Sequence, residues 1–286
     1  MDEKRVWTGG TVGVGRMPDA DTYTQKLYLS DFLRQPVIRS AIRALDLPRG
    51  SRGLDAGCGI GSHTQLLAEA VGPTGHVTGL DLSPGFLARA KETAEKRGLS
   101  ERITLQEGDV GRLAFSDDTF DWAWSVDCVG FIPAEPVSLL RGLARVVKPG
   151  GSVAILVWSS QQLLPGYPLL EARLNATSLG IAPFAKGMRP GLHFLRALGR
   201  FREAGLEETA AQTFAGDVHA PLSDDVRSAL MSLIEMRWGE PRSELSREDR
   251  AQFQRLCDPR SPDFILDVPD YYAFFTYSMF HGKIAK

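Results

Sequence analysis

The chain has 286 residues, of which 43% are hydrophobic and 24% are charged, and its formal net charge is -2. This length and composition are typical of a globular protein with one large domain, or with a domain that carries a sizeable insertion. The near-neutral charge and the lack of a basic run argue against a nucleic-acid partner.

Three cysteines, Cys58, Cys128 and Cys257, are too few and too scattered for a disulfide framework or a zinc cluster, so we expect no bound metal. No apolar run of the secretory type follows the first residues of the chain. The longest apolar stretch, Val153 to Trp158, is far too short to span a bilayer. We therefore expect a cytoplasmic protein without a membrane span.

A helix is predicted over Asp21–Leu47, because apolar residues recur there at helical spacing, and Pro36 is expected to interrupt or restart it. From Arg52 onward, short apolar strands alternate with helices, a pattern typical of a parallel, doubly wound sheet. The strands are predicted at Gly53–Ala56, His76–Leu82, Ile103–Glu107, Phe120–Val126 and Ser152–Trp158. The helices between them are predicted at Ser62–Val71, Pro84–Arg97 and Pro136–Val147.

After Trp158 this regular alternation ends. We expect irregular structure or short helices over Ser159–Gly191, a helix over Leu192–Ala204, a strand near Glu207–Phe214 and a helical stretch over Ser223–Cys257. The aromatic segment Tyr271–Ile284 is predicted to form the last strand, with Tyr271 to Tyr277 in the sheet core.

The motif that says most about function lies between a predicted strand and a predicted helix. Residues 54–61 read Leu-Asp-Ala-Gly-Cys-Gly-Ile-Gly, which places Gly57, Gly59 and Gly61 at alternate positions. Glycine permits a sharp turn and the close approach of a ligand, and the helix start that follows offers unpaired N–H groups. Taken alone, this turn leaves open a nucleotide-type cofactor and a purely structural turn.

Three further polar residues follow predicted strands at their carboxyl ends, where open α/β sheets bind ligands. Asp81 lies 20 residues past Gly61, which is the place of an acid that binds ribose hydroxyls in Rossmann-type sites. Asp109 is suited either to accept a hydrogen bond from an exocyclic amine or to close a turn. Ser125 stands near the end of the fourth strand.

These elements together resemble a known family. Asp55-x-Gly57-x-Gly59-x-Gly61, Asp81, Gly108-Asp109-Val110, Phe120-Asp121 and Arg145-Val-Val-Lys148-Pro149-Gly150-Gly151 follow the order seen in class I S-adenosylmethionine-dependent methyltransferases. The chain most resembles the small-molecule branch that includes the ubiquinone/menaquinone biosynthesis methyltransferases, over roughly Leu45 to Trp158. The resemblance implies an α/β fold: a Rossmann-like, doubly wound, mostly parallel seven-stranded sheet with an antiparallel last strand and a helical cap formed by insertions.

The resemblance also implies S-adenosylmethionine as the cofactor and assigns its contacts. The glycine turn would approach the methionine part, Asp81 the ribose, and Leu82 the adenine. A tyrosine of the N-terminal helix, Tyr28 or Tyr23, would cover the cofactor. The implied cofactor-binding residues are Asp55, Gly57, Cys58, Gly59, Gly61, Asp81, Leu82, Asp109, Val110, Ser125 and Tyr28.

On this basis the chain divides into four parts. Residues 1–47 form a segment and helix that cover the cofactor site, and residues 48–158 form the cofactor-binding core. Residues 159–191 and 222–262 form cap insertions that bind the acceptor, and residues 192–221 and 263–286 complete the sheet. We expect a small methyl acceptor, apolar or aromatic, bound by a monomer or homodimer. Candidate residues for its pocket are Tyr167, Phe184, Met188 and Trp238.

No residue stands out as a catalytic base. His193 and His219 lie in the variable half and are weak candidates, and each is equally readable as a packing or surface residue. His63, directly after the glycine turn, is expected on a helix surface.

Two alternatives stay open at this point. The first is a NAD(P)-dependent oxidoreductase with a Rossmann fold, although the Gly-x-Gly-x-Gly spacing differs from Gly-x-Gly-x-x-Gly and no Tyr-x-x-x-Lys pair occurs. The second is a non-catalytic S-adenosylmethionine-binding protein that keeps the fold.

Overall fold

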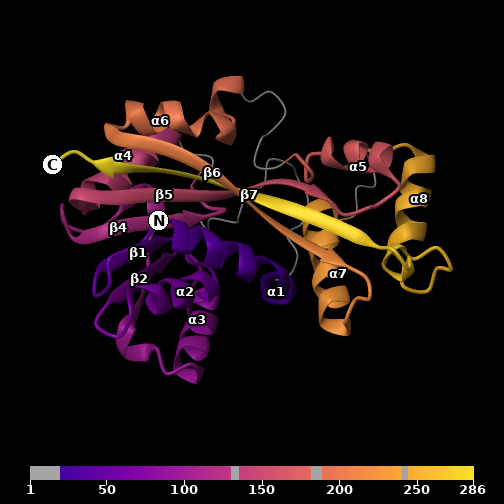
Figure 1. Ribbon diagram of the computed structural model, residues 1–286, viewed down its shortest axis with the longest axis horizontal. Helices are drawn as coiled ribbons and strands as arrows, with labels where there is room; N and C mark the ends of the chain where they lie inside the picture. The colour runs from indigo at the N-terminus through magenta and orange to yellow at the C-terminus, as the bar shows by residue number, and fades with distance from the viewer. Residues whose placement is uncertain (1–19, 130–134, 182–188, 240–243) are drawn as a thin grey trace, which may run out of the picture.

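The computed structural model describes residues 20–129, 135–181, 189–239 and 244–286, which form one seven-stranded sheet in the order β3-β2-β1-β4-β5-β7-β6 (Figure 1). The strands are β1 (Arg52–Ala56), β2 (His76–Asp81), β3 (Ile103–Glu107), β4 (Phe120–Val126), β5 (Val147–Gln162), β6 (Leu206–His219) and β7 (Tyr272–Ile284). The pairs among β1 to β5 are parallel, and β7 runs antiparallel to both β5 and β6. The predicted mostly parallel sheet with an antiparallel last strand is therefore confirmed.

Helices cover both faces of the sheet. They are α1 (Ala20–Ala44), α2 (Ser62–Val71), α3 (Pro84–Lys96), α4 (Pro136–Val146), α5 (Pro168–Asn175), α6 (Ala197–Glu203), α7 (Asp224–Trp238) and α8 (Arg247–Cys257). In Figure 1, α1, α2 and α3 lie on one side of the sheet, and α4 and α6 lie on the other. The doubly wound arrangement predicted from the alternation of strands and helices is thus present.

The central strand β4 contributes to both hydrophobic cores. Trp122 and Trp124 belong to the core that contains α1 and α2, whereas Phe120 and Ala123 belong to the core that contains α4 and α6. Successive side chains of a strand point to opposite faces, so a strand covered on both faces has to be apolar along its whole length. This constraint explains why Phe120–Val126 was predicted with its correct bounds.

Two strands are longer than predicted. β5 continues to Gln162, which pairs with Phe274, and β6 continues to His219, which pairs with Tyr272. The three strands β5, β7 and β6 thus form a ribbon that extends beyond the carboxyl ends of the parallel strands. The extension depends on pairing between segments far apart in the chain, which local hydrophobic patterning does not reveal.

The prediction that Pro36 interrupts the first helix is wrong. Helix α1 runs without a break through this residue. Pro36 lies on the exposed side, where the carbonyl group that loses its helical N–H partner remains open to water. The opposite side buries Val37, Ile38 and Ala41, and this burial outweighs the lost hydrogen bond.

The prediction of one helix over Leu192–Ala204 is wrong, whereas the helical stretch predicted over Ser223–Cys257 is present as α7 and α8. The segment 192–204 contains short 3-10 turns before α6 begins at Ala197, because the His193 ring accepts a hydrogen bond from the Leu195 N–H and closes a turn there. Helix α7 ends at Trp238, directly before Gly239, whose φ of 51° lies outside the right-handed helical region.

Helices α5, α7 and α8 gather beyond the end of β5 (Figure 1). The Trp238 indole N–H donates to the Asn175 amide oxygen at 2.9 Å, and Arg173 forms an ion pair with Asp249 at 2.6 Å. Trp238 is fully buried, so it packs within this group of helices. Phe184 and Met188, two of the predicted pocket residues, lie outside the described residues.

Within the described ranges, no helix is long and apolar enough to cross a membrane. The same residues contain no group of histidine, cysteine and acidic side chains that could hold a metal ion. The aromatic segment of β7 alternates as a half-exposed strand does: Tyr271, Phe275 and Tyr277 are buried and Tyr272 is exposed. The expected position in the sheet core is therefore confirmed for Tyr271, Phe275 and Tyr277.

Close packing at Gly53 yields a stability prediction. A Cβ atom at this position would lie 2.1 Å from the buried ring of Trp122, and the Trp122 indole is held by a hydrogen bond to Ser51. We expect Gly53→Ala to lower the free energy of unfolding by about 1–3 kcal/mol, because the ring has to shift. Urea unfolding measures this change.

The control is Gly142→Ala in α4, where no described atom lies within 4 Å of the added Cβ. This substitution should leave stability unchanged or raise it by up to about 1 kcal/mol. Equal effects of the two substitutions would contradict the packing argument.

Candidate cofactor and acceptor site

The glycine turn between β1 and α2 has two packed positions and one open position. Gly57, Gly59 and Gly61 all have positive φ values, of 79°, 53° and 78°. An added Cβ would lie 2.4 Å from the Cys128 sulfur at Gly57 and 2.6 Å from Ala90 Cβ at Gly61. At Gly59 it would meet no described atom within 4 Å. The backbone at Gly59 is therefore open to a ligand, whereas Gly57 and Gly61 are closed by the protein itself.

Asp81, at the end of β2, ties this turn to the start of α3. Its carboxylate accepts hydrogen bonds from the Gly59 N–H at 2.8 Å and the Ser83 N–H at 2.9 Å. Burial raises the pKa of Asp81, and these N–H groups oppose the rise. A carboxylate has about four acceptor positions, so Asp81 keeps capacity for a ligand's hydroxyl groups.

The two helices next to the turn begin differently. Helix α3 is capped, since the Ser83 hydroxyl accepts a hydrogen bond from the Phe86 N–H at 3.3 Å. Helix α2 begins after Gly61 without a side-chain cap from the described residues. The first N–H groups of α2 are thus available to polar atoms of a ligand.

Asp55 lies behind the turn and is almost fully buried. Its carboxylate accepts a hydrogen bond from the Thr64 hydroxyl at 2.7 Å. Burial raises the pKa of Asp55 to about 7; the charge of Asp81 adds to the rise, and the bond from Thr64 opposes it. Cys58 is also buried and lies against Gly79 of β2.

The remaining predicted cofactor residues occupy the same edge of the sheet. Asp109 caps a 3-10 turn by accepting a hydrogen bond from the Gly111 N–H at 2.7 Å, and Val110 is buried behind it. The Ser125 hydroxyl donates to the Ala56 carbonyl at 2.8 Å and accepts from the Val129 N–H at 3.2 Å. Ser125 therefore joins the ends of β1 and β4, and Leu82 is half-buried after β2.

Helix α1 brings two tyrosines to this side of the protein. Tyr28 is 56% exposed, and the Arg89 guanidinium lies 5.7 Å from the centre of its ring. The Tyr23 ring lies 6.3 Å from that of Phe86. Partial burial raises the pKa of Tyr23, with Arg34 lowering it and Asp127 raising it, and the residue is 37% exposed.

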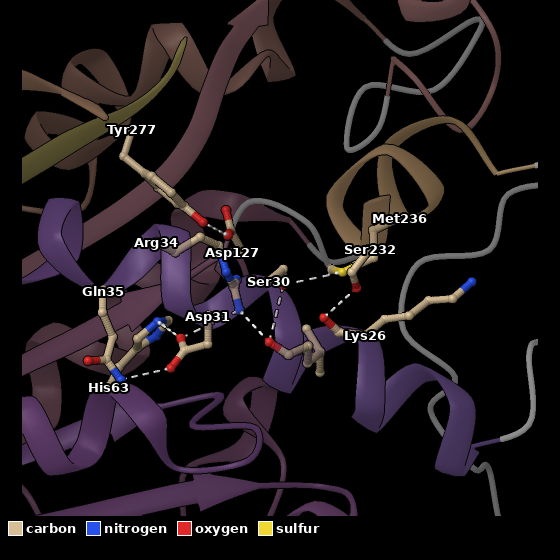
Figure 2. Close-up of polar contacts among 11 residues, drawn as sticks. Lys26, Ser30, Asp31, Arg34, Gln35, His63, Asp127, Ser232, Met236 and Tyr277 are labelled. Carbon is tan, nitrogen blue, oxygen red and sulfur yellow. Dashed lines mark hydrogen bonds and ion pairs between the residues drawn. The ribbon is translucent and has the colours of Figure 1, made fainter. Parts of the chain in front are cut away.

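A network of buried charged groups joins α1 to the sheet and to α2 (Figure 2). The Arg34 guanidinium of α1 donates to the Leu27 carbonyl at 3.4 Å and lies 3.7 Å from the Asp31 carboxylate. Burial alone would lower the pKa of Arg34, but Tyr277, Asp31 and Asp127 together raise it. Arg34 is therefore a permanent buried cation.

His63 lies in this network, so the expected helix-surface position is wrong. Its Nε2 atom is 3.8 Å from the Asp31 carboxylate (Figure 2). Burial lowers the pKa of His63 to about 4, with Asp31 raising it and Arg34 lowering it, so the ring is neutral at pH 7. Of the two candidate bases, His193 stacks on Phe194, and the His219 ring lies 2.9 Å from the Ala220 carbonyl.

Asp127, directly after β4, was not identified from the sequence. Its backbone has a φ of 46°, which is unusual for a residue other than glycine. Its carboxylate accepts hydrogen bonds from the Trp158 N–H at 2.8 Å and from the Tyr277 hydroxyl at 3.0 Å. Its place directly after a strand, at the carboxyl edge of the sheet, could have identified Asp127 from the sequence, since the same feature identified Asp81.

These residues meet at the point where the strand order reverses. β2 and β3 lie on one side of β1, and β4 and β5 lie on the other. The glycine turn follows β1, and Asp127 and Cys128 follow β4. A crevice at such a reversal point is where open α/β sheets bind ligands.

Comparison with known proteins places the chain in the family that its motifs resemble. Residues 54–151 match the family model described as a methyltransferase domain. The chain is 34% identical over 197 residues to demethylmenaquinone methyltransferase of Bacillus licheniformis, which covers 63% of this chain and 80% of that one. The chain belongs to the class I S-adenosylmethionine-dependent methyltransferases.

Two further matches show how far the likeness extends. Demethylmenaquinone methyltransferase of Bacillus cytotoxicus is 39% identical over 133 residues, which span only 53% of that protein. The structure of Haemonchus contortus phosphoethanolamine N-methyltransferase 2 in complex with S-adenosyl-L-methionine has a TM-score of 0.54 at 17% identity, covering 92% of this chain and 57% of that one. The latter likeness concerns the fold alone.

The family fixes the cofactor of this methyltransferase as S-adenosylmethionine, and the arrangement of the turn fits it. The open backbone at Gly59, the remaining acceptor capacity of Asp81 and the uncapped start of α2 provide groups for an amino acid end and for ribose hydroxyls. The oxidoreductase alternative is not favoured by these matches.

The open position at Gly59 yields a binding prediction. Gly59→Ala should weaken S-adenosylmethionine binding by about tenfold or more, because the added methyl group fills the ligand's side of the turn. The positive φ should also cost about 1–2 kcal/mol of stability. Isothermal titration with S-adenosylmethionine measures the binding change.

Gly98→Ala is the matched control. Gly98 also has a positive φ, of 66°, and no described atom within 4 Å of an added Cβ, but it follows α3 at the end far from the turn. It should lose similar stability and keep its affinity within about twofold. Equal losses of affinity would show that backbone strain, and not ligand contact, is responsible.

The buried carboxyl of Asp55 yields a pH prediction. Since its folded-state pKa of about 7 exceeds the unfolded value of 3.8, its contribution to stability is complete below pH 4 and is lost as the pH rises toward 7. The loss is at most about 4 kcal/mol. Asp55→Asn should remove this part of the decline, so the difference between variant and wild-type unfolding free energies should change between pH 4 and 7. Parallel pH profiles would contradict the shift.

Proposed function

We propose that this methyltransferase transfers the methyl group of S-adenosylmethionine to a quinol-type small aromatic acceptor. The observation that supports this acceptor best is the identity to demethylmenaquinone methyltransferases, which reaches 34% over 80% of the Bacillus licheniformis protein. The buried polar and aromatic groups around Asp127 suit a hydroxylated aromatic ring.

The cofactor contacts follow from the geometry of the turn. We assign the ribose hydroxyls to Asp81, the methionine end to the backbone at Gly59 and the start of α2, and the adenine to Leu82, Asp109 and Val110. Ser125 contributes indirectly in this assignment, because its hydroxyl joins the backbone at the ends of β1 and β4. Tyr23, and not Tyr28, covers the cofactor in this assignment, since the Tyr23 ring lies beside Phe86 at the start of α3 and Tyr28 is the more exposed of the two.

The cofactor supplies an electrophilic methyl group on a sulfonium, and the chain has to orient the acceptor and exclude water. Helix α1 and the cap helices α5, α7 and α8 contribute both to orienting the acceptor and to excluding water. The Ser232 hydroxyl of α7 donates to the Lys26 carbonyl of α1 at 2.9 Å (Figure 2). Lys26 also forms an ion pair with Glu235 at 2.8 Å. We infer that α1, α5, α7 and α8 together enclose the acceptor, as the cap insertions were expected to do.

An aromatic cluster lies beside Asp127 at the end of the sheet. The ring of Trp158 stacks on Phe275 with centroids 4.9 Å apart and meets the edge of Tyr277 at 5.3 Å. Rings in such a cluster pack well against another aromatic ring. The reduced, quinol form suits methylation because its hydroxyl groups make the ring carbons nucleophilic.

We further infer that the protein acts in the cytoplasm, as a monomer or homodimer, without a nucleic-acid partner. The described cysteines are free thiols, as a reducing compartment favours. The net charge of -2 gives no support for polyanion binding.

The ribose assignment is tested by Asp81→Ala. The substitution removes the acceptor for the ribose hydroxyls and frees the Gly59 and Ser83 N–H groups, so we expect the Kd for S-adenosylmethionine to rise about 100-fold. The control is Glu107→Ala, because Glu107 pairs with Asp81 in the neighbouring strand but is exposed. An unchanged Kd in folded Asp81→Ala protein would refute the assignment.

The acceptor is tested by assaying methyl transfer from labelled S-adenosylmethionine under anaerobic conditions. The panel is a short-chain demethylmenaquinol, its oxidised quinone, a simple phenol and an aliphatic amine. We expect turnover of the quinol at least about tenfold above every other compound. Preference for the amine, or tight binding of NADH without binding of S-adenosylmethionine, would overturn the proposal.

A further inference from the structure

A quinol has to lose a proton for each methyl group that it accepts, and the chain therefore needs a proton acceptor. Among the described residues, three side chains near the carboxyl edge of the sheet are candidates for this proton acceptor: His63, Asp31 and Asp127. His63 and Asp31 lie between α1 and α2 and face each other at 3.8 Å. Asp127 lies instead at the point where the strand order reverses, next to Cys128, which contacts the glycine turn.

Asp127 is held in one orientation by groups from several elements. The Trp158 N–H of β5 and the Tyr277 hydroxyl of β7 each donate to one of its carboxylate oxygens, at 2.8 and 3.0 Å. The backbone of Asp127 adopts a strained φ of 46°, and its own N–H donates to the Leu156 carbonyl at 2.9 Å. Backbone strain of this kind persists only where the surroundings impose it, and it is frequent at active sites.

Two cations, the buried Arg34 and the half-buried Arg237, face Asp127 from the helices that cover the sheet. Arg34 of α1 lies beside Asp127 and Tyr277 (Figure 2). Arg237 of α7 lies with its guanidinium 5.8 Å from the Trp158 ring and interacts electrostatically with Asp127 and Tyr277. The Nε atoms of both arginines have no hydrogen-bond partner among the described residues. An oxyanion on a bound ring would find donors there.

We propose that Asp127 accepts the proton of the acceptor's hydroxyl group, while Tyr277 and Arg34 position its carboxylate. This proposal deepens the proposed function and rests on it. Asp127 is then a catalytic residue, and Tyr277 and Arg34 are positioning residues. His193 and His219 are not needed as bases.

The proton balance closes on this assignment. The hydroxyl proton passes to Asp127, and the electron pair left on oxygen is delocalised to the neighbouring ring carbon. That carbon forms a bond to the methyl group while the sulfur–methyl bond breaks and sulfur keeps the bonding pair. Asp127 returns its proton to the ring oxygen, and the methylated carbon releases its hydrogen to water as a proton. One proton is released in total, and no oxidant or reductant is needed.

The groups around Asp127 also set its titration. Burial raises the pKa of Asp127, and the Trp158 N–H, Arg34, Tyr277 and Arg237 lower it, while Tyr23 is the other titratable group that faces it. A proton acceptor has to be ionised, so the wild-type rate should fall at low pH, below the pKa of this carboxyl.

The test is Asp127→Asn, with anaerobic assays of a short-chain demethylmenaquinol at saturating S-adenosylmethionine from pH 5 to 9.5. Asparagine keeps an oxygen for the Tyr277 hydroxyl but accepts no proton. We expect kcat at pH 7 to fall about 100-fold or more. The Kd for S-adenosylmethionine should stay within about twofold of the wild-type value. The rate of the variant should then rise with pH as the quinol itself ionises in solution.

Asp121→Asn is the matched control. Like Asp127, Asp121 accepts from one backbone N–H, that of Arg52 at 2.7 Å, and from one side chain, Lys148 at 2.7 Å, but it lies at the amino end of β4. Its activity and pH profile should match the wild type. If both variants lose activity alike, Asp127 is merely structural and the proposal is wrong.

If Asp127→Asn does not fold, Tyr277→Phe tests the proposal instead. Loss of this donor should raise the pKa of the Asp127 carboxyl, so the low-pH limb of kcat should move to higher pH, with a fall in kcat of about tenfold. An unmoved limb would overturn the proposal. Wild-type protein that does not methylate the quinol refutes the proposed function, whereas quinol turnover that survives Asp127→Asn refutes only the role of Asp127.

Discussion

The buried guanidinium of Arg34 is the interaction on which the closed arrangement of the protein depends. A cation removed from water costs several kcal/mol unless acceptors replace its hydration shell. Here the Leu27 carbonyl and Asp31 come from α1 itself, whereas Tyr277 comes from β7 and Asp127 from the end of β4. Helix α1 can therefore bury its apolar side only where the sheet presents these partners, and this requirement fixes where it lies.

The same requirement links helix α1 to the glycine turn. Asp127 interacts with Arg34, and its neighbour Cys128 packs against Gly57 of the glycine turn. Asp81 in turn accepts from Gly59. A short series of contacts thus leads from α1 to Asp81 at the end of β2. Each contact restricts a backbone segment, so the site is organised before a ligand binds, which reduces the entropy lost on binding.

The sequence predicted the parts of the molecule whose residues are constrained locally. Strand β4 was recognised because both of its faces are buried, and α3 because Ser83, Pro84 and Gly98 mark its ends. The glycine turn and Asp81 were recognised because the spacing itself reflects how a strand, a turn and a helix follow each other. Asp127 has no such pattern around it, and its role depends on Arg34 and Tyr277, which lie 93 residues before and 150 residues after it in the chain. Pro36 was misjudged because exposure, which makes it tolerable, is a property of packing.

The long ribbon of β5, β7 and β6 has a mechanical consequence. The pairing of β5 with β7 runs from Ser152 and Lys283 in the core to Gln162 and Phe274 beside the cap, with one shift of register between Trp158 and Ser160. Bending between core and cap would break several of the backbone hydrogen bonds between β5 and β7, so the ribbon resists bending. Helices α1 and α7 are joined to each other by side chains, among them Ser232 and Lys26. The contact between α1 and α7 depends on side-chain packing and on these few polar contacts, and so it resists separation less than the backbone ladder of the ribbon does.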